Sequence, residues 1–330
     1  MLNIFYQGDR LRKINKYLPE YLDFSQKNNH LIAQDCLSGL SLILEYLTDS
    51  NPEVLTFKTQ ELSETQFLAN CQERKTDYAL CHYYILKAQV LYWHEKTTQA
   101  LSCLKKAEVI LNVLNCKFQV AVHNFYTSLC LANLYPQASI AQQHNYLQKI
   151  IANQKQMKVW QDNCPANFQN MYLLVAAEMA RVQDQNWQAI ELYEQAIATA
   201  KADNFSQNEA LANELTARFW LEKNRPEVAE VYLKKAHYGY SVWQAWRKVK
   251  QLENNYPQYF NKLASALTNS VKRQTIVNST TSSRLGAVFD LATVMKASQA
   301  IAGEIILDKL LVKLIKILLE NTGAQSWFLK

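Results

Sequence analysis

The residue types that perform enzyme chemistry occur in this sequence, but they are not spaced as in a recognised site. Seven cysteines and six histidines are spread over 330 residues with no C-x-x-C pair, whereas zinc sites and disulfide frameworks depend on such spacing. His94-Glu95 lacks the second histidine of a zinc hydrolase helix, and no Ser or Cys has the context of a nucleophile. We therefore expect no metal site, and most cysteines are interpreted as small apolar helix residues in a reducing compartment.

The sequence also lacks the motifs that hold phosphates. It contains no G-x-x-x-x-G-K-[ST] loop, no G-x-G-x-x-G, no H-R-D and no D-F-G. These motifs cradle the phosphates or hold Mg²⁺ in ATPases, dinucleotide enzymes and kinases. We therefore predict that the chain needs no cofactor, binds no Mg-nucleotide and is not an enzyme.

The remaining chemical candidates are side chains that would contact another protein. Helix positions that face the inner groove of a helical superhelix carry mixed charges, which suit peptide or protein contact. These candidates are His82, Gln89, Glu178, Arg181, Glu214 and Arg218. The alternative is that the charges pair within the array, as Glu214 and Arg218 would at a spacing of four residues.

A recurrent alanine spacing predicts the elements that must position these residues. In three places an alanine is followed by others at +12 and +19. The sets are Ala88, Ala100 and Ala107; Ala177, Ala189 and Ala196; and Ala217, Ala229 and Ala236. Small residues at this spacing are typical of tetratricopeptide-like hairpins, where two helices cross closely. Because Ala189 and Ala229 are 40 residues apart, against about 34 in the standard repeat, we predict an all-α, tetratricopeptide-like α-solenoid of stretched helical hairpins.

The same patterns divide the chain into four parts. Residues 1–76 have helical periodicity without the alanine signature, and we interpret them as degenerate N-terminal repeats or a cap. Residues 77–260 form the predicted array, with turns expected at 95–98, 134–138, 183–186 and 222–226. Residues 261–286 are rich in Ser, Thr and Asn, which predicts a flexible linker. Residues 287–330 predict a long helix followed by a strand-like end.

Positive charge is concentrated near the end of the array. The net charge of the chain is +6, yet residues 234–284 contain nine Lys and Arg residues and only one acidic residue, Glu253. Such a stretch suits an acidic partner or nucleic acid, but no nucleic-acid recognition motif accompanies it. The alternative is a solvated last helix followed by a basic linker.

Neither end of the chain has the pattern of a membrane segment. The N-terminus, MLNIFYQGDRLRK, carries charges by residue 9 and has no apolar region of signal-peptide length. The apolar stretch 310–319 is interrupted by Lys313 and Lys316, so it is not expected to span a bilayer. The sequence therefore predicts a cytoplasmic protein without a membrane span.

Several stretches resemble the helical region of cyanobacterial multi-sensor signal transduction kinases. They include ANQKQMKVWQDNCPANFQNMYLLVAAEMARV at 152–182 and FDLATVMKASQAIAGEIILDKLLVKLIKILLENTGAQSWFLK at 289–330. In that family the domains follow one another in a fixed order. A serine/threonine kinase domain comes first, followed by an ATPase of the AAA/STAND type, this helical array, a GAF sensor domain and usually a histidine kinase. The resemblance implies that 287–330 are a junction helix and a truncated GAF-domain start. It also implies that the catalytic domains lie outside these 330 residues, so no active-site residue is carried over.

The predicted function is that of a non-catalytic helical scaffold or relay module in a signal-transduction kinase. Its partners would be another protein or the adjacent kinase, ATPase and GAF domains, and self-association through the C-terminal helix is expected because its apolar face lacks a sheet to cover it. Two alternatives stay open: a basic array that binds nucleic acid or an acidic partner, and an enzyme with an unrecognised site.

Overall fold

The computed structural model describes residues 2–49, 56–115 and 117–260, and their regular secondary structure is entirely helical. The α-helices are α1 Leu2–Tyr6, α2 Leu11–Lys27, α3 Leu31–Thr48, α4 Glu64–Arg74, α5 Asp77–Trp93, α6 Thr97–Val109, α7 Phe118–Leu134, α8 Ile140–Asn163, α9 Pro165–Val182, α10 Asn186–Ala202, α11 Ser206–Glu222, α12 Pro226–Trp243 and α13 Trp246–Asn255. The all-α prediction is therefore confirmed for these residues. The linker predicted at 261–286 and the GAF start predicted at 287–330 lie outside them.

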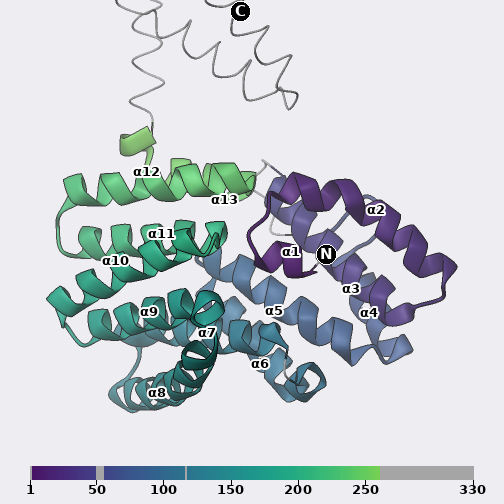
Figure 1. Cartoon of the computed structure of the whole chain (residues 1–330), viewed down its shortest axis with the longest axis horizontal. Coiled ribbons are helices and arrows are strands. Elements are labelled where there is room, and N and C mark those ends of the chain that lie inside the picture. Colours follow the sequence, from purple (N-terminus) through teal and green to yellow (C-terminus); the bar gives the residue numbers. More distant parts are fainter. Residues whose placement is uncertain (1, 50–55, 116, 261–330) are drawn as a thin grey trace, which may run out of the picture. The chain divides into compact units, whose positions relative to one another are not determined.

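Consecutive helices pack against each other as hairpins (Figure 1). The most extensive pairs are α11 with α12, α9 with α10 and α5 with α6. These are the three hairpins that carry the alanine sets. Each of the four predicted turns, at 95–98, 134–138, 183–186 and 222–226, overlaps an observed break between helices.

All nine alanines of the three sets are at most 1% exposed. A methyl side chain at these positions lets the backbones of neighbouring helices approach closely. The same logic extends to Gly239 on α12, where an added Cβ would lie 2.9 Å from Ala210 Cβ on α11. The alanine spacing therefore identified buried helix contacts correctly.

The turns between helices repeat one geometry, which the alanine pattern did not predict. A residue with positive φ follows the helix end at Asp184, Asn204 and Asn224. The next amide then donates to the carbonyl five residues back, for example Gln185 N to Ala180 O at 2.9 Å. This is the Schellman arrangement, which satisfies carbonyls at the end of a helix. Asn and Asp suit these positions because they tolerate the left-handed conformation better than other non-glycine residues.

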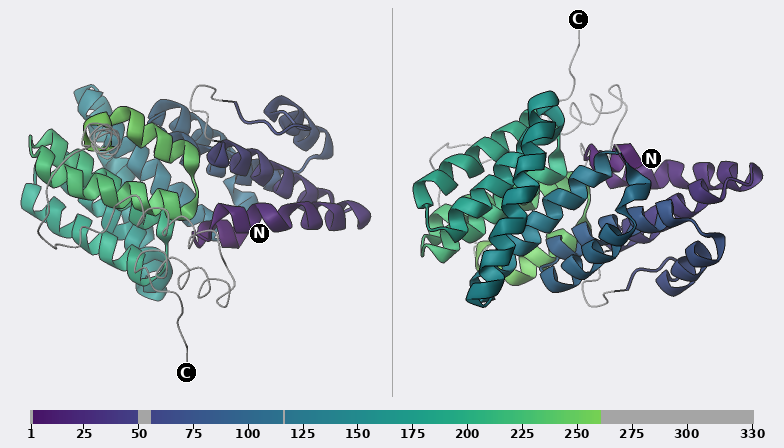
Figure 2. Two further views of the ribbon diagram at one scale, coloured as in Figure 1. Left: turned by 90° about the horizontal axis from the view of Figure 1, so that it is seen from above. Right: turned by 90° about the horizontal axis from the view of Figure 1, so that it is seen from below.

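The first helices pack against the last described helices. Both views of Figure 2 show the N-terminal end of the chain beside the end of the helical array. The Phe5 ring of α1 lies 5.7 Å from that of Trp243 on α12, and Gln207 Nε2 on α11 donates to Tyr6 O at 2.6 Å. Arg12 N donates to Gln244 Oε1 at 3.0 Å. The described residues thus belong to one compact unit, Met1–Thr268, in which α1 and the start of α2 contact α11, α12 and Gln244.

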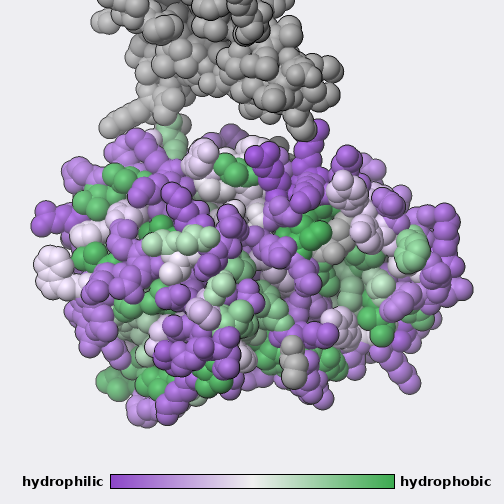
Figure 3. All heavy atoms as spheres, viewed as in Figure 1, coloured by the Kyte–Doolittle hydropathy of each residue, from purple (hydrophilic) through white to green (hydrophobic). Residues whose placement is uncertain are grey.

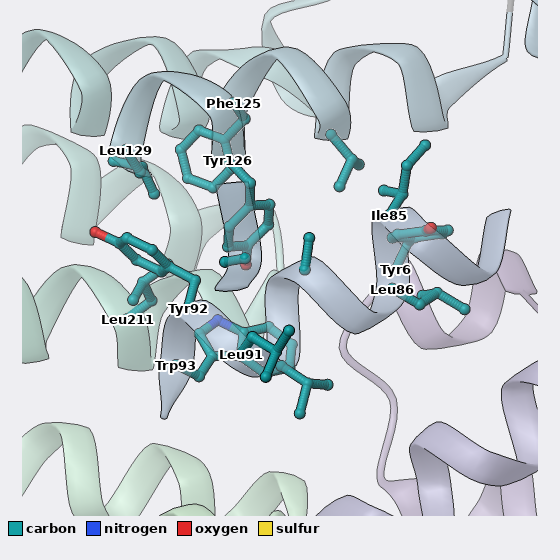
Figure 4. Packing of buried hydrophobic residues seen from close by; sticks show 14 of the residues in the cluster. Tyr6, Ile85, Leu86, Leu91, Tyr92, Trp93, Phe125, Tyr126, Leu129 and Leu211 are labelled. Carbon is teal, nitrogen blue, oxygen red and sulfur yellow. The ribbon is translucent and has the colours of Figure 1, made fainter. Parts of the chain in front are cut away.

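Aromatic side chains fill the space where these ends meet. Trp93 at the end of α5 contacts the ring of Trp243 edge-on at 5.1 Å and that of Tyr126 on α7 at 6.2 Å. Figure 4 shows Trp93, Tyr92 and Tyr126 close together, with Tyr6 of α1 farther along the same layer. Burial of such large rings contributes about 1.5–3 kcal/mol each, so this cluster ties α5, α7 and α12 together.

One described helix, α3 (Leu31–Thr48), is long and apolar enough to cross a membrane by length and composition. The sequence interpretation overlooked it. In this structure, however, 56% of its apolar stretch is buried against other parts of the protein, including α2 and α5. Core helices of water-soluble proteins have this property too, so α3 is weak evidence for a membrane span.

Candidate functional site

The structure places the six predicted groove residues between helices rather than on an open surface. His82, Gln89, Glu178 and Glu214 are at most 3% exposed, and the side chains of Arg181 and Arg218 are 9% and 19% exposed. They come from α5, α9 and α11. They separate into two charged clusters, one around Glu214 and one around Glu178, while His82 and Gln89 lie near α1.

Glu214 is the centre of the first cluster. Its carboxylate, which is fully buried, accepts hydrogen bonds from Lys248 Nζ at 2.7 Å and Tyr240 Oη at 2.9 Å, and it pairs with Arg218. The ion pair expected between Glu214 and Arg218 four residues apart is therefore present. Lys248 Nζ also donates to Trp93 O at the end of α5, so one ammonium group connects α13, α11 and α5.

The charges in this cluster balance each other. Burial by itself raises the pKa of Glu214, but the cations of Lys248 and Arg218 outweigh it and lower that pKa to about 2. Burial lowers the pKa of Lys248, although the Glu214 carboxylate counteracts it. Arg218 also pairs with Glu95 Oε1 at 3.0 Å. With two acids and two cations in contact, each buried charge is compensated, as burial requires.

The second cluster is centred on Glu178 of α9. Arg181 Nη2 lies 2.7 Å from Glu178 Oε2 and donates to Ala132 O of α7 at 3.3 Å. Tyr193 of α10 donates to the other carboxylate oxygen of Glu178, and Arg181 Nη1 reaches Glu222 of α11 at 3.4 Å. Helices α7, α9, α10 and α11 are thus connected through one buried ion pair, since Glu178 contacts α10 and Arg181 contacts α7 and α11.

His82 and Gln89 lie on the part of α5 that faces α1. His82 has no hydrogen-bond partner for either ring nitrogen among the described residues, and burial lowers its pKa to about 4. Its ring lies 6.4 Å from that of Tyr6 and 5.3 Å from that of Tyr78. Gln89 Nε2 donates within its own helix, to Ile85 O at 3.4 Å. The two side chains are therefore packed against aromatic rings and backbone.

The cations of α13 require a correction to the sequence interpretation. Arg247 and Lys248 were counted in the basic stretch that would face solvent, an acidic partner or nucleic acid, but they are 3% and 0% exposed. Arg247 Nε donates to Tyr46 O at 2.8 Å, and its guanidinium lies 4.3 Å from the centre of the Tyr46 ring. Sequence reasoning missed both residues because their partners are about 200 and 155 positions away. Strong amphipathic periodicity in 246–255 was the signal that could have indicated a packed helix.

The described residues also contain hollows on their surface. One of them, about 580 Å³, lies where the turn before α2 meets the starts of α9 and α11, and Asp9, Arg10, Asn167, Asp203 and Ser206 contribute to its lining. Charges of both signs at this hollow favour no particular ligand. Figure 3 shows hydrophilic side chains over much of the face seen in Figure 1, with hydrophobic side chains in small groups between them.

Within the described ranges no group of three or more His, Cys, Asp or Glu side chains is placed to hold a metal ion. Five of the cysteines there are buried and unpaired, namely Cys36, Cys71, Cys81, Cys103 and Cys130. Burial raises the pKa of Cys36 and Cys81 to about 12. These thiols therefore stay protonated at neutral pH, which makes them poor nucleophiles.

Comparison with known proteins gives one local similarity. The chain is 40% identical over 62 residues to hybrid signal transduction histidine kinase G of Dictyostelium discoideum. The match covers 19% of this chain and 2% of that kinase, so the chain spans only a small part of the relative's length. No family model matches the chain, and no solved structure matches it. The similarity points to signal transduction and to nothing finer.

Proposed function

We propose that this chain is a non-catalytic helical module of a signal-transduction kinase, which binds a protein partner or couples the domains attached to it. The all-α structure, the local similarity to a histidine kinase and the buried alanine sets support this proposal. In it the helical hairpins are stretched tetratricopeptide-like repeats, and 287–330 begin a GAF domain. The module works in the cytoplasm and needs no cofactor.

The observation that carries the proposal is the way in which α13 is held. This helix is the last one described before residue 261, and its consecutive cations Arg247 and Lys248 reach Tyr46 of α3 and Trp93 of α5. A displacement of α13 would therefore break buried interactions with helices from the other end of the array. An element with costly, specific contacts of this kind can relay a mechanical change between domains.

The buried clusters also bear on where a partner would bind. Glu178, Arg181, Glu214 and Arg218 pair with each other and with neighbouring helices. In our proposal these side chains therefore fix the spacing of the helices and do not bind the partner. Arg247 and Lys248 are buried, so two of the cations counted in favour of nucleic-acid binding are not exposed for contact with a nucleic acid. We therefore place partner contacts on the outer helix faces.

The test begins with the coding DNA on either side of this chain, which should encode kinase and sensor domains in frame. In that longer protein, Lys248→Met should weaken the response of kinase activity to the signal while basal phosphorylation persists. The exposed Lys250 of the same helix provides the matched control, Lys250→Met. An unchanged response in Lys248→Met would contradict the relay.

The isolated chain gives a second test. Calorimetric titration with Mg-ATP should show no binding, because no phosphate-binding loop occurs in the sequence, and titration with duplex DNA should show none of the steep salt dependence of nucleic-acid binding. Micromolar ATP binding or substrate turnover would favour the enzyme alternative, and salt-dependent DNA binding the basic array.

A further inference from the structure

Helix α2 has three exposed aromatic side chains on one face. Tyr17, Tyr21 and Phe24 are 42%, 51% and 66% exposed. Their spacings of four and three residues place them in a row along the helix, which lies at the outer edge of the described unit (Figure 1). Leu31 and Ile32, just after the turn at the end of α2, are each 45% exposed. A row of this kind is typical of a helix that packs on another helix.

A hollow lies beside this row, and its lining has a regular spacing. Glu20, Tyr21, Asp23, Phe24 and Lys27 surround a space of about 370 Å³. Positions 20, 23, 24 and 27 are related as i, i+3, i+4 and i+7, so they form a four-residue hole on the helix surface. In helix pairs such a hole receives one side chain of the facing helix. The hollow of α2 is therefore suited to an aromatic side chain presented by another helix.

The charges at the edge of the row are self-complementary. Glu20 and Lys27 are seven residues apart, so they lie on the same side of the aromatic row. If a second α2 runs antiparallel so that Tyr21 of each copy faces Phe24 of the other, Glu20 of each copy comes next to Lys27 of the other. Among the described residues Glu20 has no ion-pair partner, whereas Lys27 pairs with Asp23 at 2.6 Å. The second copy would place Lys27 between two carboxylates.

We propose that α2 is the dimerisation helix of this protein and pairs antiparallel with α2 of a second copy. A two-fold axis across the helix uses each contact twice, which is the usual geometry of homodimers. The occupant is a second copy rather than an unrelated helix because the aromatic row, the hole and the Glu20 and Lys27 charges complement their own rotated image. This interface is separate from the buried clusters that carry the proposed relay.

The first experiment measures the mass of the full chain by light scattering after size exclusion, over a range of concentrations. The wild-type chain should show a concentration-dependent dimer, and Tyr21→Ser should raise its dissociation constant at least tenfold. The control is Trp187→Ser, since Trp187 on α10 is 87% exposed and lies outside α2. A wild-type chain that stays monomeric, or equal association of wild type and Tyr21→Ser, would overturn the proposal.

The second experiment tests the register by charge reversal. Glu20→Lys alone places lysines opposite each other and should weaken the dimer, as should Lys27→Glu alone. The double variant Glu20→Lys/Lys27→Glu restores opposite charges and should recover most of the wild-type association. All of these positions are exposed, so circular dichroism should show the same helix content in each variant. Failure of the double variant to recover would contradict the antiparallel register.

Discussion

Lys248 is a cation without access to water, and its charge is compensated by Glu214 at 2.7 Å. Replacing both members of such a pair by apolar residues is often tolerated, but removing one member leaves an uncompensated buried charge. The cluster therefore contributes more to the precise placement of α13 than to net stability. Single substitutions in it should be far more damaging than substitutions of surface ion pairs.

We expect Lys248→Met to lower the free energy of unfolding by about 3–5 kcal/mol, because it breaks a buried ion pair. Urea denaturation followed by circular dichroism measures this loss. The control is Lys250→Met, whose ion pair with Glu253 is exposed and should contribute less than about 1 kcal/mol.

Coupling between the two charges gives an independent check on this prediction. Lys248→Met/Glu214→Gln removes both formal charges of the pair, so its loss should be smaller than the sum of the two single losses. Equal values for the double variant and the sum would show that the two side chains do not interact.

His82 makes stability depend on pH. Burial lowers its pKa to about 4, against about 6.5 in an unfolded chain. Between these values the unfolded state binds more protons, so stability rises with pH and is lost as the pH falls from about 6.5 towards 4. The contribution amounts to a few kcal/mol in total.

Replacing this imidazole should therefore flatten the pH profile. His82→Phe should reduce the fall in urea midpoint between pH 7 and pH 4.5, since no proton can then be taken up at position 82. The wild-type profile, measured under the same conditions, is the reference. If the urea midpoint of His82→Phe depended on pH as strongly as that of the wild type, other groups, such as His94, would account for the dependence.

The helical hairpins owe their close spacing to small residues at the crossings. Ala229 on α12 is fully buried, and α12 forms the most extensive helix contact of the described unit with α11. A larger side chain at this point has no space unless the two helices separate. The stability of the hairpin should therefore be sensitive to volume at this position.

Ala229→Leu should destabilise the protein by about 1–3 kcal/mol through overpacking. Ala198 on α10 is exposed, so Ala198→Leu should change stability by no more than about 0.5 kcal/mol. Comparison of the two urea midpoints tests the assignment of Ala229 as a crossing residue, and similar small shifts would contradict it.

Contacts between the two ends make the described unit a closed assembly of helices. Phe5, which is 1% exposed, packs against Trp243, and Gln207 and Arg12 add hydrogen bonds. Linear repeat arrays transmit stability mainly between neighbours. Here α1 bridges helices that are more than 200 residues away in sequence, so a change at either end should affect the other.

Phe5→Ala should lower stability by about 3–5 kcal/mol and should accelerate hydrogen exchange in both α1 and α12. Exchange in α8, which none of the three contacts named above reaches, should follow only the global loss. Mass spectrometry of peptides from these helices measures the difference. Faster exchange confined to α1 would show that the two ends are not coupled.

The sequence by itself determined the features that depend on neighbours along the chain. Helix periodicity, the alanine spacing and the turn residues specified the helices, the buried crossings and the turns, because each arises from residues a few positions apart. The Glu214–Arg218 ion pair was predictable for the same reason. Only the tertiary structure decided that Lys248 completes this pair, that Arg247 contacts Tyr46 and that α1 covers His82. These contacts span tens to hundreds of residues in sequence. The burial of Arg247 and Lys248 on α13, where exposure was expected, depends on the packing of α13 against distant helices.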